Sequence, residues 1–139
     1  MKKQKRMMKK PTSKNYKGIK EGYKSGLEEK IAKQISDKGF KVQYETAVLD
    51  YIDPMVHKYH PDFVLPNNIT IETKGRFLPK DRRKHLLIKK QYPDMDLRFV
   101  FNNSKAKLSK KSKTTYADWC IKNGFKFADK LIPDEWFNE

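Results

Sequence analysis

The chain has 139 residues, a length that suits one domain with a modest core. Its 32 Lys and Arg outnumber its 17 Asp and Glu, and the formal net charge of +15 predicts a polyanionic partner, either nucleic acid or an acidic membrane surface. No apolar run of about 18 residues is present, so a membrane span is not expected. Cys120 is the only cysteine, which excludes an intrachain disulfide and fits a reducing, cytoplasmic setting.

The basic charge is concentrated at the N-terminus. Residues 1–24 hold ten Lys and Arg and a single acid, Glu21, which leaves a net charge of +6 for residues 25–139. We expect residues 1–17 to form a flexible basic arm and residues 18–139 to form a single domain. The arm is either a solubilising tail or a segment that follows DNA phosphates. No apolar stretch follows it, so it does not resemble a secretory signal.

The first predicted element is a helix over residues 26–38. Ser25 and Glu28 have the spacing of a capping box, with Ser25 as N-cap, and Gly39 is a natural stop. Apolar residues recur at four-residue spacing inside this segment. Alternation over residues 42–48 then predicts a strand. Residues 50–60 contain Pro54 and little periodicity, and we expect a connector there.

The second half of the chain alternates strands and helices. Residues 63–65 and 69–71 predict a hairpin, and a helix is expected from Asp81, as N-cap, to Gln91, with apolar contacts from Leu86, Leu87 and Ile88. Residues 97–101 predict a buried strand parallel to 69–74. Residues 102–113 carry five lysines and predict a surface loop. Thr115 caps a last predicted helix that ends near Gly124, and the apolar C-terminal segment is expected to dock on the body.

The hairpin register brings acidic residues together. If residues 66–68 form the loop, Phe63 faces Ile71 and Asp62 faces Glu72. The apolar residues then share one face, whereas a two-residue loop would mix apolar and acidic side chains. In this register Asp62, Glu72 and Lys74 lie on the same face of the hairpin.

Two opposed carboxylates repel each other unless a cation lies between them. Oxygen ligands suit Mg²⁺ or Mn²⁺, which polarise a phosphodiester and lower the pKa of a bound water. Lys74 has two possible roles, because it could handle the attacking water or neutralise charge that develops on the phosphate. The alternative for the whole pattern is a solvated strand face with ordinary turn chemistry.

Other candidates have competing interpretations. Glu28 is explained by the helix cap, but it also lies on the face turned to the sheet and could help hold a second metal. His60 could approach Asp62, or serve as a structural histidine. The cations from Arg82 to Lys84 are either a solvated face or a phosphate clamp.

Four segments together resemble the phage endonuclease I family, the Holliday-junction resolvases of the PD-(D/E)xK nuclease superfamily. They are Ser25 to Glu28, Pro61 to Phe63, Glu72 to Gly75 and Asp81 to Ile88, and the stretch Lys126 to Pro133 is also similar to family sequence. The resemblance covers residues 18–137. It implies an α/β fold with a restriction-endonuclease-like core, in which helices flank a mixed central β-sheet.

The resemblance also implies the chemistry. It places Glu28, Asp62, Glu72 and Lys74 on the family's catalytic positions, and it implies two Mg²⁺ or Mn²⁺ ions per site, with the Thr73 carbonyl completing one shell. It implies a domain-swapped homodimer with a bridge near residues 45–56 and a helical glutamate supplied by the partner chain. Paired cuts in four-way and other branched DNA would leave 5′-phosphates, in the cytoplasm of an infected bacterium if the gene is viral. Candidate DNA-binding residues are Lys17, Lys20, Lys24, Arg76, Arg82, Arg83, Lys84, Lys105 and Lys107.

Two other functions remain open on the residues alone. A non-catalytic nucleic-acid-binding module explains the basic charge equally well, but it gives no reason for opposed acids in a protein that binds polyanions. A membrane-surface protein is a weaker alternative, because the basic arm lacks an apolar helical face. No small-molecule cofactor is expected beyond the metal.

Overall fold

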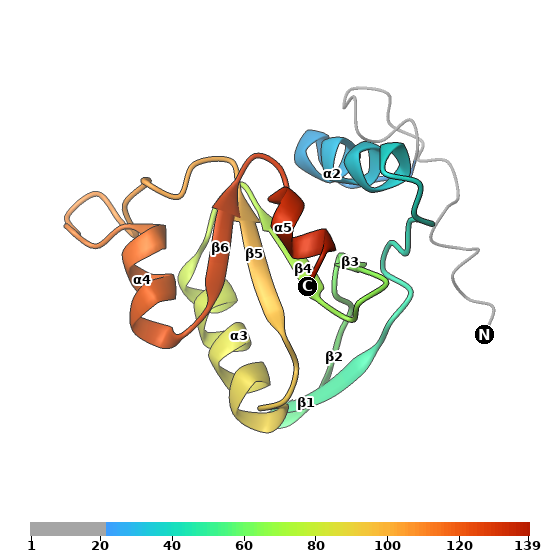
Figure 1. Cartoon of the computed structure of the whole chain (residues 1–139). Coiled ribbons are helices and arrows are strands. Elements are labelled where there is room, and N and C mark those ends of the chain that lie inside the picture. Colours follow the sequence, from blue (N-terminus) through green and yellow to red (C-terminus); the bar gives the residue numbers. More distant parts are fainter. Residues whose placement is uncertain (1–21) are drawn as a thin grey trace.

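A four-stranded mixed β-sheet forms the centre of the chain in the computed structural model, which describes residues 22–139 (Figure 1). Its order is β3-β4-β5-β6, with bounds Phe63–Val64, Thr70–Lys74, Leu97–Phe101 and Lys126–Asp129. β3 pairs antiparallel with β4, whereas β4, β5 and β6 are parallel neighbours. The mixed α/β class with flanking helices is therefore confirmed. Within residues 22–139, none of the helices has the length and apolar character that crossing a membrane requires.

Helix α2 (Gly26–Asp37) confirms the first predicted element. The Ser25 hydroxyl accepts a hydrogen bond from the Glu28 N–H at 3.1 Å, and Gly39 follows the helix with a left-handed φ of 88°. A left-handed residue is favourable only for glycine at this position. The buried stripe of α2 packs on the sheet and consists of Leu27, Ile31, Ala32 and Ile35.

The segment after α2 differs from the prediction. Residues 42–48 form no strand beyond an isolated bridge between Tyr44 and Phe63, because Glu45 takes a φ of 53° that breaks the extended backbone. The expected connector is instead an antiparallel hairpin of β1 (Leu49–Asp53) and β2 (Met55–Tyr59). Tyr51 and Tyr59 pack one side of the hairpin against Ile88. This packing stabilises the hairpin although its sequence has little periodicity.

A crossover connects the parallel strands β4 and β5 through α3 (Pro79–Gln91), as predicted. The helix begins three residues before the expected position, with Leu78 rather than Asp81 as N-cap, because Pro79 suits the first helical turn and Asp81 accepts the Leu78 N–H at 3.1 Å from inside the helix. Its apolar contacts are confirmed for Leu87 and Ile88 but not for Leu86. His85 and Ile88 are buried, whereas Leu86 is exposed.

The C-terminal part adds a strand that the sequence did not predict. Helix α4 (Tyr116–Asn123) has the expected Thr115 N-cap and ends at the left-handed Gly124, and β6 then extends the sheet beside β5. Helix α5 (Asp134–Phe137) buries Trp136, which confirms that the C-terminal segment docks on the body.

Two apolar clusters cover the two faces of the sheet. Side chains of α2 and α5 pack on one face with Phe63, Ile71 and Val100. Aromatic residues of β5, α4 and the loop before α3 pack on the other face, among them Phe77, Phe99, Phe101 and Trp119. In Figure 1 the β1–β2 hairpin extends from the edge of the sheet toward the end of α3. The predicted acidic residues Glu28, Asp62 and Glu72 lie on α2, directly before β3 and on β4, respectively.

Candidate active site

The hairpin register places Asp62 opposite Glu72. Phe63 pairs with Ile71, Val64 pairs with Thr70, and the Leu65 N–H donates to the Ile69 carbonyl at 2.8 Å, so residues 66–68 form the loop. Phe63 and Ile71 are fully buried on the opposite face. The predicted register is therefore confirmed, and both carboxylates are almost completely buried.

Asp62 is held by the neighbouring strand through one oxygen. Its Oδ2 accepts hydrogen bonds from the Thr73 N–H at 2.8 Å and from the Thr73 hydroxyl at 2.9 Å. Burial, and then repulsion by Glu72 and Glu28, raises the pKa of Asp62 well above its usual range. The two Thr73 hydrogen bonds thus compensate the ionised carboxylate only in part, and a cation would supply the rest.

Glu72 is bonded on one side and faces an ammonium on the other. Its Oε1 accepts the Tyr59 hydroxyl at 2.7 Å, and the Lys74 Nζ lies 3.5 Å from Oε2. Burial raises the pKa of Glu72, although Lys74 and the Tyr59 hydrogen bond oppose this shift. The Lys74 Nζ also lies 3.5 Å from Asp81 Oδ1.

The protonation of Lys74 bears on the two roles left open by the sequence. Burial lowers its pKa, but the carboxylates of Glu72, Asp81 and Asp62 outweigh burial and raise the pKa above the ordinary value. In the metal-free protein Lys74 is therefore an ammonium at neutral pH. An ammonium can neutralise anionic charge, whereas it cannot accept a proton from water.

Glu28 has a capping role and a place beside Asp62 in the same chain. Besides the Ser25 cap, its Oε1 accepts the Lys24 N–H at 2.8 Å and the Tyr44 hydroxyl at 2.7 Å. The Glu28 carboxylate therefore accepts from the backbone N–H of Lys24 rather than from that of the N-cap residue, Ser25. The two interpretations of Glu28 are compatible in this geometry.

Glu45 is a fourth acid that the sequence analysis missed. Its N–H donates to the Asp62 carbonyl at 2.9 Å, and its buried Oε2 lies 3.1 Å from the exposed Lys24 Nζ. The alternation over residues 41–48 assigned Glu45 to a polar strand face. Its left-handed backbone turns it inward instead, and no periodicity signals such a residue.

The acids form a donor set that fits a hard cation. Glu28, Glu45 and Asp62 are all buried, and each offers a carboxylate oxygen within 4.8 Å of the others. Oxygen-rich groups of this kind suit Mg²⁺, Mn²⁺ or Ca²⁺. Asp62 belongs both to this group and to the facing pair with Glu72.

Three lysines line the cavity at this acidic site. A cavity of about 410 Å³ has Glu45, Asp62 and Glu72 among its lining, together with Lys24, Lys58 and Lys84, and His60 also reaches it. Basic side chains beside buried acids can hold the flanking phosphates of a polyanion while a cation occupies the acids. Lys58 was not predicted. A larger cavity of about 710 Å³ beside α2 contains none of the four predicted catalytic residues.

The remaining basic candidates are scattered. The Arg83 guanidinium donates two hydrogen bonds to the Asp53 carboxylate. The Arg82 Nη1 donates to the Phe77 carbonyl at 2.6 Å. Lys105 lies on the exposed loop before α4, Lys107 bridges to Thr115, and Arg76 is exposed after β4. Lys17 and Lys20 lie outside the described residues. Of the predicted set within residues 22–139, the structure gathers only Lys24 and Lys84 at the acidic cavity.

Comparisons with known proteins find similar sequences. A family model described as phage endonuclease I matches residues 8–139. The chain is 51% identical over 126 residues to the protein named Endonuclease I of Escherichia phage T7, covering 88% of this chain and 85% of that protein. It is 53% identical over 112 residues to Endodeoxyribonuclease 1 of Enterobacteria phage T3, covering 80% and 74% of the two chains.

Proposed function

The chain belongs to the phage endonuclease I family, and on this premise we propose that it is a divalent-metal-dependent endodeoxyribonuclease that resolves four-way DNA junctions. The observation that carries the proposal is the buried Asp62, which faces Glu72 on one side and neighbours Glu28 and Glu45 on the other. The names of the two relatives support DNA as the substrate. Four acids are buried near one cavity in a chain of net charge +15. Buried carboxylates that lie this close together destabilise the fold unless cations compensate their charge.

Two cation positions that share Asp62 suit the arrangement of donors. Asp62 and Glu72, with the Thr73 carbonyl, would hold one ion, and Asp62 and Glu28 would hold the other. Mg²⁺ or Mn²⁺ bound there supplies Lewis acidity and lowers the pKa of a coordinated water. Thr73 fixes Asp62, Tyr59 fixes Glu72 and Tyr44 fixes Glu28, and each of these bonds uses only one oxygen of its carboxylate.

Lys74 acts as an electrostatic stabiliser in this proposal. Its ammonium lies beside Glu72 and is mostly buried, so its interaction with a nearby phosphate is weakly screened by water. Charge that develops on the phosphodiester oxygens during hydrolysis would be neutralised there. The carboxylates keep Lys74 protonated, which suits this role better than general-base catalysis.

Junction selectivity would come from the backbone of branched DNA. Lys24, Lys58 and Lys84 surround the acidic cavity and are suited to phosphates that flank the cleaved bond. Two such sites in a homodimer would cut two strands of a four-way junction and leave 5′-phosphates. This activity belongs in the cytoplasm of the infected bacterium.

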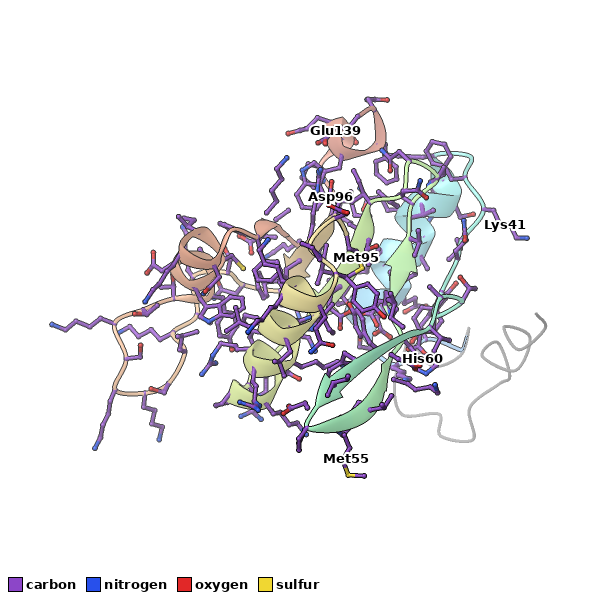
Figure 2. All side chains as sticks on the ribbon, turned by 90° about the horizontal axis from the view of Figure 1, so that it is seen from below. Lys41, Met55, His60, Met95, Asp96 and Glu139 are labelled. Atoms are coloured by element: carbon purple, nitrogen blue, oxygen red, sulfur yellow. The ribbon has the colours of Figure 1, made fainter. Side chains whose placement is uncertain are left out.

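The domain-swapped dimer is part of the proposal. The β1–β2 hairpin overlaps the expected bridge at residues 45–56, and it exposes Ile52, Met55 and Val56 by 55%, 73% and 62%. Figure 2 shows Met55 projecting away from the body at the tip of this hairpin. Exposed apolar side chains on a two-stranded hairpin suit burial against a second copy. If α2 were exchanged between chains, Glu28 would keep its contacts with the residues that precede the bridge, because those residues would move with α2.

Cleavage of a synthetic four-way junction tests the function. The full chain is incubated with the junction, with plain duplex and with single strands, in Mg²⁺, Mn²⁺ or Ca²⁺. We expect paired cuts in the junction with Mg²⁺ or Mn²⁺, and binding without cutting in Ca²⁺. Absence of cleavage in both active metals would refute the nuclease and favour the non-catalytic binding module. Light scattering at micromolar concentration tests the dimer, and a monomer would count against the swap.

A further inference from the structure

His85 is a fully buried polar residue whose ring nitrogens are both unpaired. It lies on α3 at 0% exposure, and neither Nδ1 nor Nε2 has a hydrogen-bond partner within residues 22–139. Its ring packs edge-on against Tyr59, with centroids 5.4 Å apart, and against Phe99, with centroids 5.0 Å apart. Among the described side chains, no other buried nitrogen or oxygen lacks a partner.

Packing alone does not explain a histidine at this position. Burial of a polar group without a hydrogen bond destabilises a fold, whereas an apolar side chain of similar shape carries no such cost. Ile88, one turn further along α3, is equally buried and entirely apolar. His85 therefore destabilises the fold relative to an apolar residue, and a functional role would explain why an imidazole lies here.

A carboxylate of the candidate active site lies close to His85. His85 Nε2 lies 3.9 Å from Glu72 Oε2, which is beyond hydrogen-bonding distance by about 1 Å. The other oxygen of Glu72 already accepts the Tyr59 hydroxyl. The Lys74 Nζ lies 3.5 Å from the same Oε2. Tyr59 and His85, from β2 and α3, thus flank the two oxygens of one carboxylate.

We propose that His85 is a positioning residue for Glu72, donating its Nε2–H to Oε2 when Glu72 binds the divalent cation. The inference rests on the proposed function. A carboxylate oxygen has two lone pairs, so Oε2 can bind a cation through one and accept His85 through the other. The donor also has to be uncharged, because a second cation would repel the metal. A neutral imidazole that carries its proton on Nε2 provides such a donor.

Metal affinity measured without DNA tests this role. Binding of Mn²⁺ alone is followed by calorimetry for the unchanged protein and for His85→Phe, His85→Gln and Ile88→Val. We expect His85→Phe to bind Mn²⁺ ten- to a hundredfold more weakly, the usual effect of losing an outer partner of a metal ligand. His85→Gln retains an amide donor and recovers part of the affinity. Ile88→Val perturbs the same helix face and leaves the affinity unchanged.

Stability separates positioning from packing. In EDTA the free energy of unfolding of His85→Phe should equal or exceed that of the unchanged protein, because a buried unpaired polar group has been removed. Unchanged Mn²⁺ affinity in a folded His85→Phe would overturn the inference and leave the nuclease proposal intact. Failure of the unchanged protein to bind Mn²⁺ would instead overturn the metal-dependent function, and this inference with it.

A spectroscopic measurement on the unchanged protein does not depend on the variants folding. Nitrogen-15 chemical shifts of the imidazole report which ring nitrogen carries the proton. We expect His85 to be neutral and protonated at Nε2, with the Nε2 shift changing when Ca²⁺ is added. A ring protonated at Nδ1 in the Ca²⁺-loaded protein would overturn the proposal, because Nε2 would then have no hydrogen to donate.

Discussion

The Tyr59 hydroxyl donates to Oε1 of Glu72 at 2.7 Å, and both residues are buried. Tyr59 ends β2, whereas Glu72 lies in the middle of β4, so this bond connects the peripheral hairpin to the acidic site. A carboxylate held at one oxygen has a restricted orientation and keeps its second oxygen for a cation. The placement of Glu72 therefore depends on a hairpin that pairs with no strand of the central sheet.

Removal of this hydroxyl should impair metal binding and cleavage together. We expect Tyr59→Phe to lower Mn²⁺ affinity about tenfold, since Glu72 loses the donor that fixes it. Cleavage of a four-way junction under single-turnover conditions should fall with it. Tyr51→Phe removes a hydroxyl from the same hairpin and serves as the matched control. Equal rates in the two variants would contradict a positioning role for Tyr59.

Asp62→Asn should stabilise the metal-free protein while abolishing cleavage. The pKa of Asp62 is raised in the folded state, so the fold binds this proton more tightly than the unfolded chain does. The destabilisation caused by ionised Asp62 is absent below pH 3.8, which is near the pKa of this residue in the unfolded chain. It grows as the pH rises through the folded pKa and is complete above it. Each unit of the raised pKa corresponds to about 1.4 kcal/mol. Urea unfolding in EDTA at pH 5 and pH 8 measures the difference.

Addition of Mg²⁺ supplies the control for that prediction. The cation offsets the repulsion among ionised carboxylates, so Mg²⁺ should stabilise the unchanged protein more than Asp62→Asn. A variant that is less stable than the unchanged protein at pH 8 in EDTA would contradict the raised pKa of Asp62.

Glu45→Gln should weaken the cation position formed with Glu28 and Asp62. The variant removes one negative charge from a buried group whose oxygens lie within 4.8 Å of one another. We expect the Mg²⁺ concentration for half-maximal cleavage to rise about tenfold, and Mn²⁺ titration should show weaker binding at one position. Glu29→Gln removes one negative charge from α2 at the residue next to Glu28. It should leave the half-maximal Mg²⁺ concentration and the Mn²⁺ titration unchanged. Identical titrations for the two variants would exclude Glu45 from metal binding.

Lys84 and Arg83 should contribute unequally to DNA binding, although they are adjacent on α3. Lys84 lines the acidic cavity with its Nζ over the Tyr59 ring, whereas the Arg83 guanidinium is engaged by Asp53. Lys84→Ala should weaken junction binding in Ca²⁺ and reduce the salt dependence of log affinity by about one phosphate contact. Arg83→Ala should have the smaller effect. A larger loss from Arg83→Ala would place the phosphate contacts elsewhere on α3.

Local patterns in the sequence determined the elements whose residues are close in the chain. The caps at Ser25 and Thr115 act over three residues, and alternation across residues 63–71 selects one hairpin register because any other would bury the acids among apolar side chains. Asp62 and Glu72 could therefore be paired from the sequence alone. Sequence resemblance, rather than spacing, added Glu28 to them.

Tertiary packing decided the rest. The β1–β2 hairpin has little periodicity, and it is defined by the burial of Tyr51 and Tyr59 against α3. The apolar side chain of Leu86 predicted a core contact, but Leu86 is exposed and His85 packs inward against Tyr59 and Phe99 instead.

The same limit applies to the partners of the site. Asp62 and Glu72 meet across one short hairpin, so their pairing follows from alternation. Tyr44 with Glu45, Tyr59, and His85 come from three separate segments, and each reaches the acids through a turn or a packing contact. Their convergence has no local pattern to encode it, because it depends on how α2, the hairpin and α3 pack around the sheet.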